Sequence, residues 1–259
     1  MCEDCGCGDT KLVPVHVHTS LLARNQHEAD HLRAHFRESH VTAVNLMGSP
    51  GAGKTALLEA TAGLLGGRRR LAAVSGDLAT THDADRLLRA GVPAASITTG
   101  TACHLDASMV DRVLHNTPFG ERAHTCDFFF IENVGNLVCP AIYDLGQKAN
   151  VVCLSVTEGV DKPLKYPPMF RDADLVVLTK VDLLPYLPGV TISALADNLA
   201  RVMVKPRFIE VSTVTPSRST GLDAWVSFLE AQRDGLLAEA QGVGAGHSHG
   251  GHAHPHSHR

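Results

Sequence analysis

The segment GSPGAGKT, residues 48–55, has the residue types and spacing of a loop that binds nucleotide phosphates. Its glycines let backbone N–H groups curl around phosphate oxygens, and a helix predicted to begin at Lys54 adds the positive end of its dipole. Lys54 is expected to reach the β and γ phosphates, and Thr55 to offer its hydroxyl to Mg²⁺. A glycine-rich turn with a chance Lys-Thr pair is the alternative, which the apolar run before the loop and the helical pattern after it oppose. The predicted nucleotide-binding residues are Gly48, Ser49, Pro50, Gly51, Ala52, Gly53, Lys54 and Thr55.

A second short motif, TKVD at residues 179–182, could recognise a guanine base. It resembles the N-K-x-D motif of GTPases, in which the Asp carboxylate accepts hydrogen bonds from two guanine N–H groups and the Lys covers the base. Adenine would leave that carboxylate facing an acceptor, and unpaired buried groups give discrimination on the order of 10⁴. Alone, TKVD also fits a solvated strand end. Behind a phosphate-binding loop, it predicts that Lys180 and Asp182 select GTP over ATP.

Two features of the predicted base site depart from the GTPase pattern. Thr179 stands where the motif has Asn, so the amide that usually braces the site is missing and looser binding is expected. VST, residues 211–213, resembles the last guanine-contacting loop, although the following TPSRSTG is longer and more polar than the usual turn. Ser212 and Thr213 are predicted as further contacts.

Mg²⁺ prefers carboxylate and water oxygens, so an acid is needed near Thr55. Asp77 follows the apolar run LAAVSG, and Glu132 opens the phrase ENVG, which resembles the D-x-x-G switch with Glu for Asp. Each could instead be a helix N-cap or a surface acid. Taken together they fit a switch pair, and we predict that Lys54, Asp77 and Glu132 are catalytic. No arginine finger is identifiable, so slow intrinsic turnover is expected.

The N-terminus carries three thiols, Cys2, Cys5 and Cys7, within a few residues of each other. This spacing is too tight for a stapled secreted fold, and three such thiolates can chelate one soft or borderline ion without a fold to position them. A redox pair of Cys2 and Cys5 is the alternative, but no thioredoxin-like strand and helix surround the motif. A metal site is therefore predicted here.

A second group of metal ligands is predicted within the nucleotide-binding region. Cys103 and His104 lie in TGTACHLD, and Cys139 follows the ENVG phrase. Each alone is usually core filler or a surface group. A cysteine close to the switch glycine Gly135, however, would let the nucleotide state move a metal ligand. The two cysteines in apolar strand runs, Cys126 and Cys153, are expected in the core.

Histidine is concentrated at the C-terminus. Six of the sixteen histidines fall in the last thirteen residues, interspersed with Gly, Ser, Ala and Pro. A purification tag is normally an unbroken run, so a native metal-buffering segment is favoured over a tag or a chance low-complexity end. Imidazole suits Ni, Cu and Zn. The residues are His247, His249, His252, His254, His256 and His258.

Composition sets the class of protein. The 259 residues are 44% hydrophobic and 19% charged, with a formal net charge of -4, which gives no basic field for nucleic acid or anionic lipid. No apolar run approaches the roughly 20 residues of a membrane helix, and the N-terminus lacks the basic start and apolar stretch of a signal peptide. We therefore expect a cytoplasmic globular protein without nucleic-acid or membrane partners.

The elements that position these motifs follow from hydrophobic periodicity. Near-continuous apolar runs alternate with helical patterns, which is typical of strands buried on both faces of a mostly parallel sheet. A three-layer α/β P-loop NTPase domain is predicted over residues 20–241, between a Cys-rich segment at 1–19 and a His-rich tail at 242–259 that we expect to be disordered without metal. The predicted strands are TAVNLMG, LAAVSGD, CDFFFIEN, VVCLSVTE, LVVLTKVD and RFIEVST.

GSPGAGKT, TACHLD, ENVGNLVCP, TEGVDKPLKYP, TKVDLLPYL and the N-terminal CEDCGCG together resemble the HypB family of hydrogenase maturation GTPases. The resemblance covers about residues 20–238 and the N-terminal cysteines. It implies a SIMIBI-type GTPase that forms a homodimer with nucleotide and works with a HypA-type accessory protein. It also implies that GTP hydrolysis with Mg²⁺ helps to insert Ni²⁺ into the precursor of the nickel–iron hydrogenase large subunit.

The resemblance also assigns the metal ligands. Cys2, Cys5 and Cys7 match the family's tight nickel site, and the residues of TACHLD and ENVGNLVCP match a weaker nickel or zinc (Zn²⁺) site. His-rich storage segments in the family usually lie near the N-terminus, whereas this one is C-terminal. Two alternatives remain: a urease-accessory nickel GTPase, which the cysteine motifs argue against, and a metal buffer whose nucleotide domain serves only assembly. The ligands matched to the weaker site are Cys103, His104 and Cys139.

Overall fold

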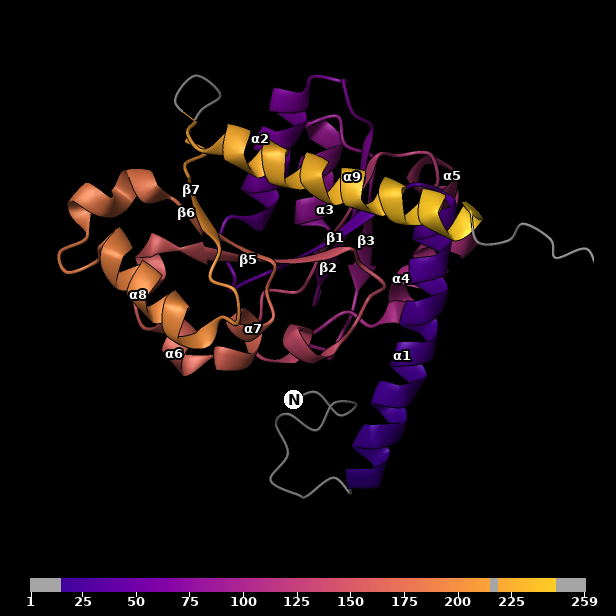
Figure 1. Cartoon of the computed structure of the whole chain (residues 1–259), viewed down its shortest axis with the longest axis horizontal. Helices are drawn as coiled ribbons and strands as arrows, with labels where there is room; N and C mark the ends of the chain where they lie inside the picture. The colour runs from indigo at the N-terminus through magenta and orange to yellow at the C-terminus, as the bar shows by residue number, and fades with distance from the viewer. Residues whose placement is uncertain (1–14, 215–218, 246–259) are drawn as a thin grey trace, which may run out of the picture.

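The structure is a computed structural model that describes residues 15–214 and 219–245 (Figure 1). Cys2, Cys5, Cys7 and the six C-terminal histidines lie outside the described residues. The predictions for these two segments therefore remain predictions. Helix α1 (Val15–Glu38) begins a few residues before the predicted domain boundary at 20, and α9 (Leu222–Ala245) extends beyond the boundary at 241.

The fold is the predicted three-layer α/β arrangement. Its central sheet is seven-stranded with the order β3-β2-β4-β1-β5-β6-β7, and every pairing is parallel. Six strands match the predicted runs. The seventh, β3, was missed because it is an edge strand in which only Ile97 is buried. The strands are β1 (Thr42–Met47), β2 (Leu71–Asp77), β3 (Ala94–Thr98), β4 (Phe128–Glu132), β5 (Ala149–Ser155), β6 (Leu175–Thr179) and β7 (Phe208–Val211).

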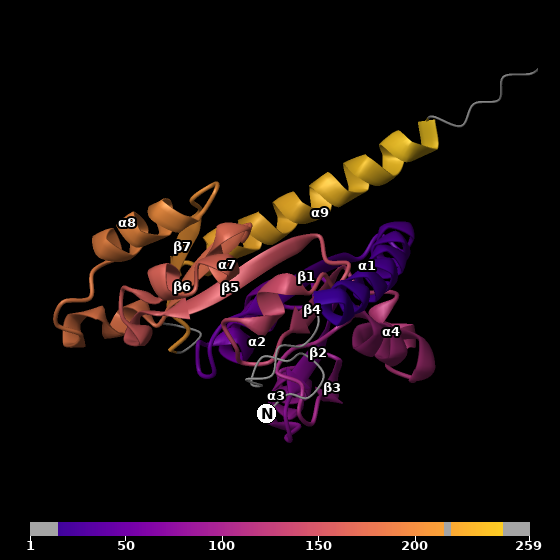
Figure 2. The same cartoon turned by 90° about the horizontal axis from the view of Figure 1, so that it is seen from below.

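Helices cover both faces of the sheet (Figure 1). Helices α2, α3 and α9 pack on one face, while α1, α4 and α5 cover one half of the other face and α7 and α8 its second half. Figure 2 shows α1 beside α4 at one end of the sheet and α8 at the opposite end. The remaining bounds are α2 (Lys54–Leu65), α3 (His82–Arg89), α4 (Ala107–Asn116), α5 (Gly120–Ala123), α6 (Lys162–Lys165), α7 (Pro167–Arg171), α8 (Ile192–Val202), η1 (Cys139–Ile142), η2 (Val156–Glu158) and η3 (Val181–Tyr186).

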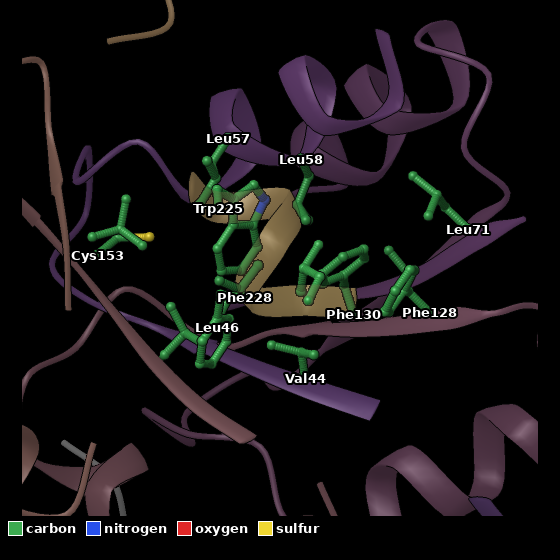
Figure 3. Packing of buried hydrophobic residues seen from close by; sticks show 14 of the residues in the cluster. Val44, Leu46, Leu57, Leu58, Leu71, Phe128, Phe130, Cys153, Trp225 and Phe228 are labelled. Atoms are coloured by element: carbon green, nitrogen blue, oxygen red, sulfur yellow. The ribbon is translucent and has the colours of Figure 1, made fainter. Parts of the chain in front are cut away.

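The core on the α2 and α9 face combines aliphatic side chains with a small group of aromatic rings (Figure 3). Phe130 of β4 contacts Trp225 of α9, with ring centroids 6.5 Å apart, and the indole N–H of Trp225 donates to the hydroxyl of Thr61 over 2.8 Å. Successive β4 side chains point to opposite faces of a sheet, so Phe129 packs on the α1 side instead. This central strand is buried on both faces and holds its last residue, Glu132, at a fixed position.

The predicted core cysteines are buried. Cys126 and Cys153 are 4% and 0% exposed, and burial raises the pKa of each thiol to about 12. Both thiols are therefore protonated at pH 7, as expected for cysteines that pack in the core. Among the helices of the described ranges, none combines the length and apolar character that crossing a bilayer requires.

Candidate nucleotide and metal site

The phosphate-binding loop joins the end of β1 to the first residue of α2. Gly48 has φ 145°, and a Cβ there would lie 2.4 Å from the carbonyl oxygen of Cys153, so only glycine fits. Lys54 begins α2, is buried, and its ammonium donates to the carbonyls of Gly48 and Ser49 at 3.3 and 3.2 Å. The loop borders a cavity of ≈ 450 Å³ at the carboxyl ends of the strands, where open α/β sheets bind ligands.

Two carboxylates converge on the hydroxyl of Thr55. Its Oγ1 lies 2.7 Å from Glu132 Oε1 and 2.8 Å from Asp83 Oδ1, and its single proton can serve only one of them at a time. Glu132 is 3% exposed, and its Oε2 is buried without a hydrogen-bond partner among the described residues. Desolvation, followed by the charge of Asp83, raises the pKa of Glu132 to about 6, although Thr55 and Lys54 lower it. Such a set of oxygens fits a divalent cation.

Sequence reasoning missed Asp83. It is the second residue of α3, where an acid is favoured by the helix dipole alone, so its position gave no distinct functional signal. Asp77, the predicted residue, lines the same cavity, but its Oδ1 accepts hydrogen bonds from the N–H groups of Ala79 and Thr80. The bond from Ala79 is the largest of the causes that lower the pKa of Asp77. The described contact to Thr55 thus comes from Asp83, and the role predicted for Asp77 remains a prediction.

The guanine motif packs directly against the phosphate-binding loop. Thr179, which stands in place of Asn, donates its hydroxyl to the carbonyl of Ala52 over 2.6 Å and so provides a brace of a different kind. Lys180 adopts a left-handed conformation with φ 58° and donates to the carbonyl of Gly51 over 2.8 Å. These contacts hold the base-reading segment and the loop in one rigid unit.

Ser212 and Thr213, the last two predicted base contacts, lie in different surroundings in the structure. The hydroxyl of Ser212 donates to the Asp182 carboxylate over 2.5 Å, which orients the carboxylate that is predicted to read guanine. Thr213 instead lines a neighbouring cavity beside Ala60 and Leu64 of α2.

Three basic side chains border the nucleotide cavity within the described part of the chain: Lys54, Lys180 and Arg86. Arg86 donates two hydrogen bonds to the Glu59 carboxylate, at 3.0 and 2.6 Å, and lies 3.5 Å from Asp83. Its guanidinium is thus already held by acids on α2 and α3.

The structure brings together the three predicted ligands of the internal metal site. The ligand atoms of Cys103, His104 and Cys139 lie within 4.8 Å of one another, and the two sulfurs are 2.8 Å apart. His104 is 5% exposed, and its ring stacks on that of Tyr143 with centroids 3.8 Å apart. Tyr143, which no sequence motif indicated, fixes the orientation of the imidazole. Two sulfurs and one nitrogen suit zinc or nickel.

The metal group and the phosphate-binding loop share the segment after β4. Gly135 packs so closely on Pro50 that a Cβ would lie 2.9 Å from its backbone. The next residue, Asn136, forms a backbone bridge with Gly48, and its side chain donates to the carbonyl of Cys103 over 3.4 Å. A single residue therefore touches both sites.

A second link runs through Asn133, the residue after β4. Its Oδ1 accepts a hydrogen bond from the N–H of Leu105 over 3.1 Å, and Asn133 also borders the nucleotide cavity. Cys103 and Leu105, on the two sides of His104, are thus hydrogen-bonded to Asn136 and Asn133 in the segment that follows β4.

The family model described as CobW/HypB/UreG, nucleotide-binding domain, matches residues 42–209. The hydrogenase maturation factor HypB of Azotobacter vinelandii is 47% identical over 217 residues, which is 84% of this chain and 69% of the relative. This chain belongs to the HypB family. A HypB crystal structure from Helicobacter pylori in complex with nickel has a TM-score of 0.76 at 37% identity, covering 82% of this chain and 97% of that one. HypB from Archaeoglobus fulgidus gives a TM-score of 0.72 at 37% identity, covering 82% and 99%.

The HypB match agrees with the resemblance seen in the sequence and covers most of the chain. The relative and both structures are HypB proteins, whereas the matching family model also includes UreG. Membership in a nucleotide-binding family also agrees with the cavity that the phosphate-binding loop, Asp83, Glu132 and Lys180 line together.

Proposed function

We propose that this chain binds and hydrolyses GTP with Mg²⁺ and uses that cycle to control delivery of nickel during maturation of nickel–iron hydrogenase. The observation that carries the proposal is the contact of Asn136 with both Gly48 and Cys103. The relatives named hydrogenase maturation factors and the nickel-bound HypB structure support the choice of metal and process.

The residues around the cavity supply the parts of phosphoryl transfer. Lys54 and the loop N–H groups bind the β and γ phosphates, and the Thr55 hydroxyl with the acids beside it would hold Mg²⁺. When bound, Mg²⁺ neutralises charge on the phosphate oxygens. Asp182 selects guanine. Because Glu59 already engages Arg86, we expect slow intrinsic turnover.

The Cys103, His104 and Cys139 group would carry nickel or zinc as cargo. GTP and GDP differ by the γ phosphate, which would bind beside the loop that Gly135 and Asn136 contact. A shift of this segment would move Cys139, three residues further on, and change metal affinity. By linkage, metal binding must change nucleotide affinity by the same factor.

The partners in the proposal are a second copy of the chain, a HypA-type accessory protein and the hydrogenase large subunit precursor. Val138 and Ile142 flank Cys139 and are 55% and 54% exposed, so an apolar surface lies next to the metal ligands. We assign this surface to the nucleotide-dependent dimer. Sedimentation with a GTP analogue should then show a dimer for the natural chain and a monomer for Val138→Asp.

Substitution of Lys54 separates the proposed switch from a metal buffer. Lys54→Ala should abolish GTP hydrolysis by the purified protein, which should still bind nickel in the absence of nucleotide. In a strain that lacks the natural gene, this variant should not support hydrogenase maturation. A buffer would still support maturation. Lys205→Ala, at an exposed position away from the cavity, is the matched control and should behave as the natural chain.

A further inference from the structure

Three histidines far apart in the sequence meet at the end of the sheet where α1 packs against α4. His35 lies in the last turns of α1, His115 near the end of α4, and His124 directly after α5. Each offers one ring nitrogen, and these nitrogens all lie within 4.8 Å of one another. We refer to these three residues as the histidine cluster.

The rings of the histidine cluster are packed closely enough to share a ligand. His35 Nε2 and His124 Nδ1 are 2.8 Å apart, and the ring of His115 lies 5.0 Å from that of His35 and 5.6 Å from that of His124. In a tetrahedral zinc site with bonds of about 2.0–2.1 Å, neighbouring nitrogens are about 3.3 Å apart. Small side-chain rotations would therefore convert the contact between His35 and His124 into two ligand bonds.

The carboxylate of Asp111 lies next to the histidine cluster. Asp111, one turn before His115 on α4, has its Oδ1 3.0 Å from His115 Nδ1 and 3.5 Å from His31 Nδ1. His115 Nδ1 also lies 3.2 Å from the backbone carbonyl oxygen of Asp111, which can accept its proton and leave the lone pair on Nε2. Oxygen partners of this kind orient metal-ligating imidazoles in many sites. Asp111 Oδ1 is itself buried.

The environment of the cluster suits binding from solution. His115 is exposed, while His35 and His124 are half-buried. Partial burial, with the charges of His124 and His115 next in order, lowers the pKa of His35.

We propose that His35, His115 and His124 bind one borderline divalent ion, zinc or nickel, with Asp111 as the positioning residue for His115. This site is distinct from the Cys103 group, which lies before the start of α4, because the ten residues of the helix span about 15 Å. It contains no thiolate, so imidazole-preferring ions fill it and water or His31 completes the coordination. The proposal is independent of GTP hydrolysis.

The test uses the full chain with the other donors replaced and Co²⁺ as the probe. Cobalt should bind in one equivalent with visible ligand-field bands and without the near-ultraviolet sulfur charge-transfer band of a thiolate site. Zinc should displace it. In this background the replaced donors are Cys2, Cys5, Cys7, Cys103 and Cys139, each changed to Ser, and the six C-terminal histidines, each changed to Asn.

Variants of the cluster decide the outcome. His115→Ala and His124→Ala should each weaken cobalt binding at least about 100-fold, and Asp111→Asn about 10-fold to 100-fold. His82→Ala, which removes an exposed histidine of α3, should leave binding unchanged. Retained GTP binding reports that each variant is folded.

A second measurement covers the case in which the multiply substituted chain fails to fold. Equilibrium dialysis of the otherwise natural chain against zinc should lose one bound equivalent on His115→Ala, whose site is at the surface. Absence of cobalt binding in a folded background, or an unchanged zinc equivalent in His115→Ala, would overturn the proposal.

Discussion

The side-chain amide of Asn136 donates to the carbonyl oxygen of Cys103 over 3.4 Å. The backbone of Asn136 is also bridged to Gly48, in the phosphate-binding loop. The same side chain accepts a hydrogen bond from the N–H of Val138, next to Cys139. Both cysteines of the internal metal group are therefore positioned by a residue that rests on the nucleotide-binding loop.

Removal of this amide should uncouple the two sites without emptying either. We expect Asn136→Ala still to bind GTP and nickel, while the ratio of nickel affinities between the two nucleotide states falls towards one from the roughly 5-fold to 150-fold typical of such couplings. Calorimetric titration of nickel in each state measures the ratio.

Asn198→Ala is the matched control for that experiment. Asn198 also donates its amide to a backbone carbonyl, that of Val160, but lies on α8 at the far end of the sheet. The coupling should be unchanged in this variant, and a loss there equal to that in Asn136→Ala would contradict the assigned role.

Glu132 should make stability depend on pH. Its pKa is raised from 4.5 to about 6 in the folded protein, so the folded state disfavours the charged form and loses stability as pH rises through 6. Glu132→Gln removes this penalty. Without Mg²⁺ or nucleotide, its free energy of unfolding relative to the natural chain should rise by about 2 kcal/mol between pH 4.5 and pH 8.

Urea unfolding at the two pH values, with chelator present, measures that difference. Any pH-independent effect of the substitution, such as a changed hydrogen bond to Thr55, cancels in the comparison. If the free energy of unfolding of Glu132→Gln differed from that of the natural chain by the same amount at pH 4.5 and pH 8, burial would not raise the pKa of Glu132.

The two aspartates that line the nucleotide cavity, Asp83 and Asp77, should respond differently. Asp83→Asn should weaken Mg²⁺-dependent nucleotide binding about 10-fold to 100-fold, because Asp83 contacts the Thr55 hydroxyl directly. Asp77→Ala should chiefly lower the free energy of unfolding, by about 1 kcal/mol, since its carboxylate caps two N–H groups. Fluorescent-nucleotide titrations at varied Mg²⁺ and thermal melts separate the two effects.

Asp182 should decide the choice of base. Two hydrogen bonds from guanine to a carboxylate are worth about 1.5–3 kcal/mol each, so Asp182→Ala should weaken GTP binding about 10²-fold to 10⁴-fold and leave weak ATP binding unchanged. Asp197→Ala, an exposed acid on α8, should alter neither. Competition binding with GTP and ATP checks this, and equal losses for both nucleotides would exclude a base-reading role.

Strong periodic signals made most of the fold predictable. The six predicted strands are apolar enough to be recognised singly, and the face of α1 formed by Ala29, Leu32 and Phe36 is buried as its spacing indicates. β3 was not predicted because most of its side chains are partly exposed, as is common at a sheet edge. The pairing of β3 with β2 depends on tertiary structure, which the hydrophobic pattern of a short segment does not predict.

The candidate site was predictable where a motif has fixed spacing. The loop around Lys54 and the segment around Asp182 were found this way, whereas Asp83, Tyr143 and the histidine cluster were not. Those residues act through contacts between segments that are far apart in the sequence. Nothing in their local sequence distinguishes them from surface residues. Packing, rather than spacing, brings them together.

The most direct test of the account is a pair of nickel titrations of the natural chain, one with GDP and one with a non-hydrolysable GTP analogue. The link through Asn136 predicts that the two dissociation constants differ, by roughly 5-fold to 150-fold for a typical coupling, and that saturating nickel changes the affinity ratio of the two nucleotides by the same factor. Identical nickel dissociation constants in both states would contradict it.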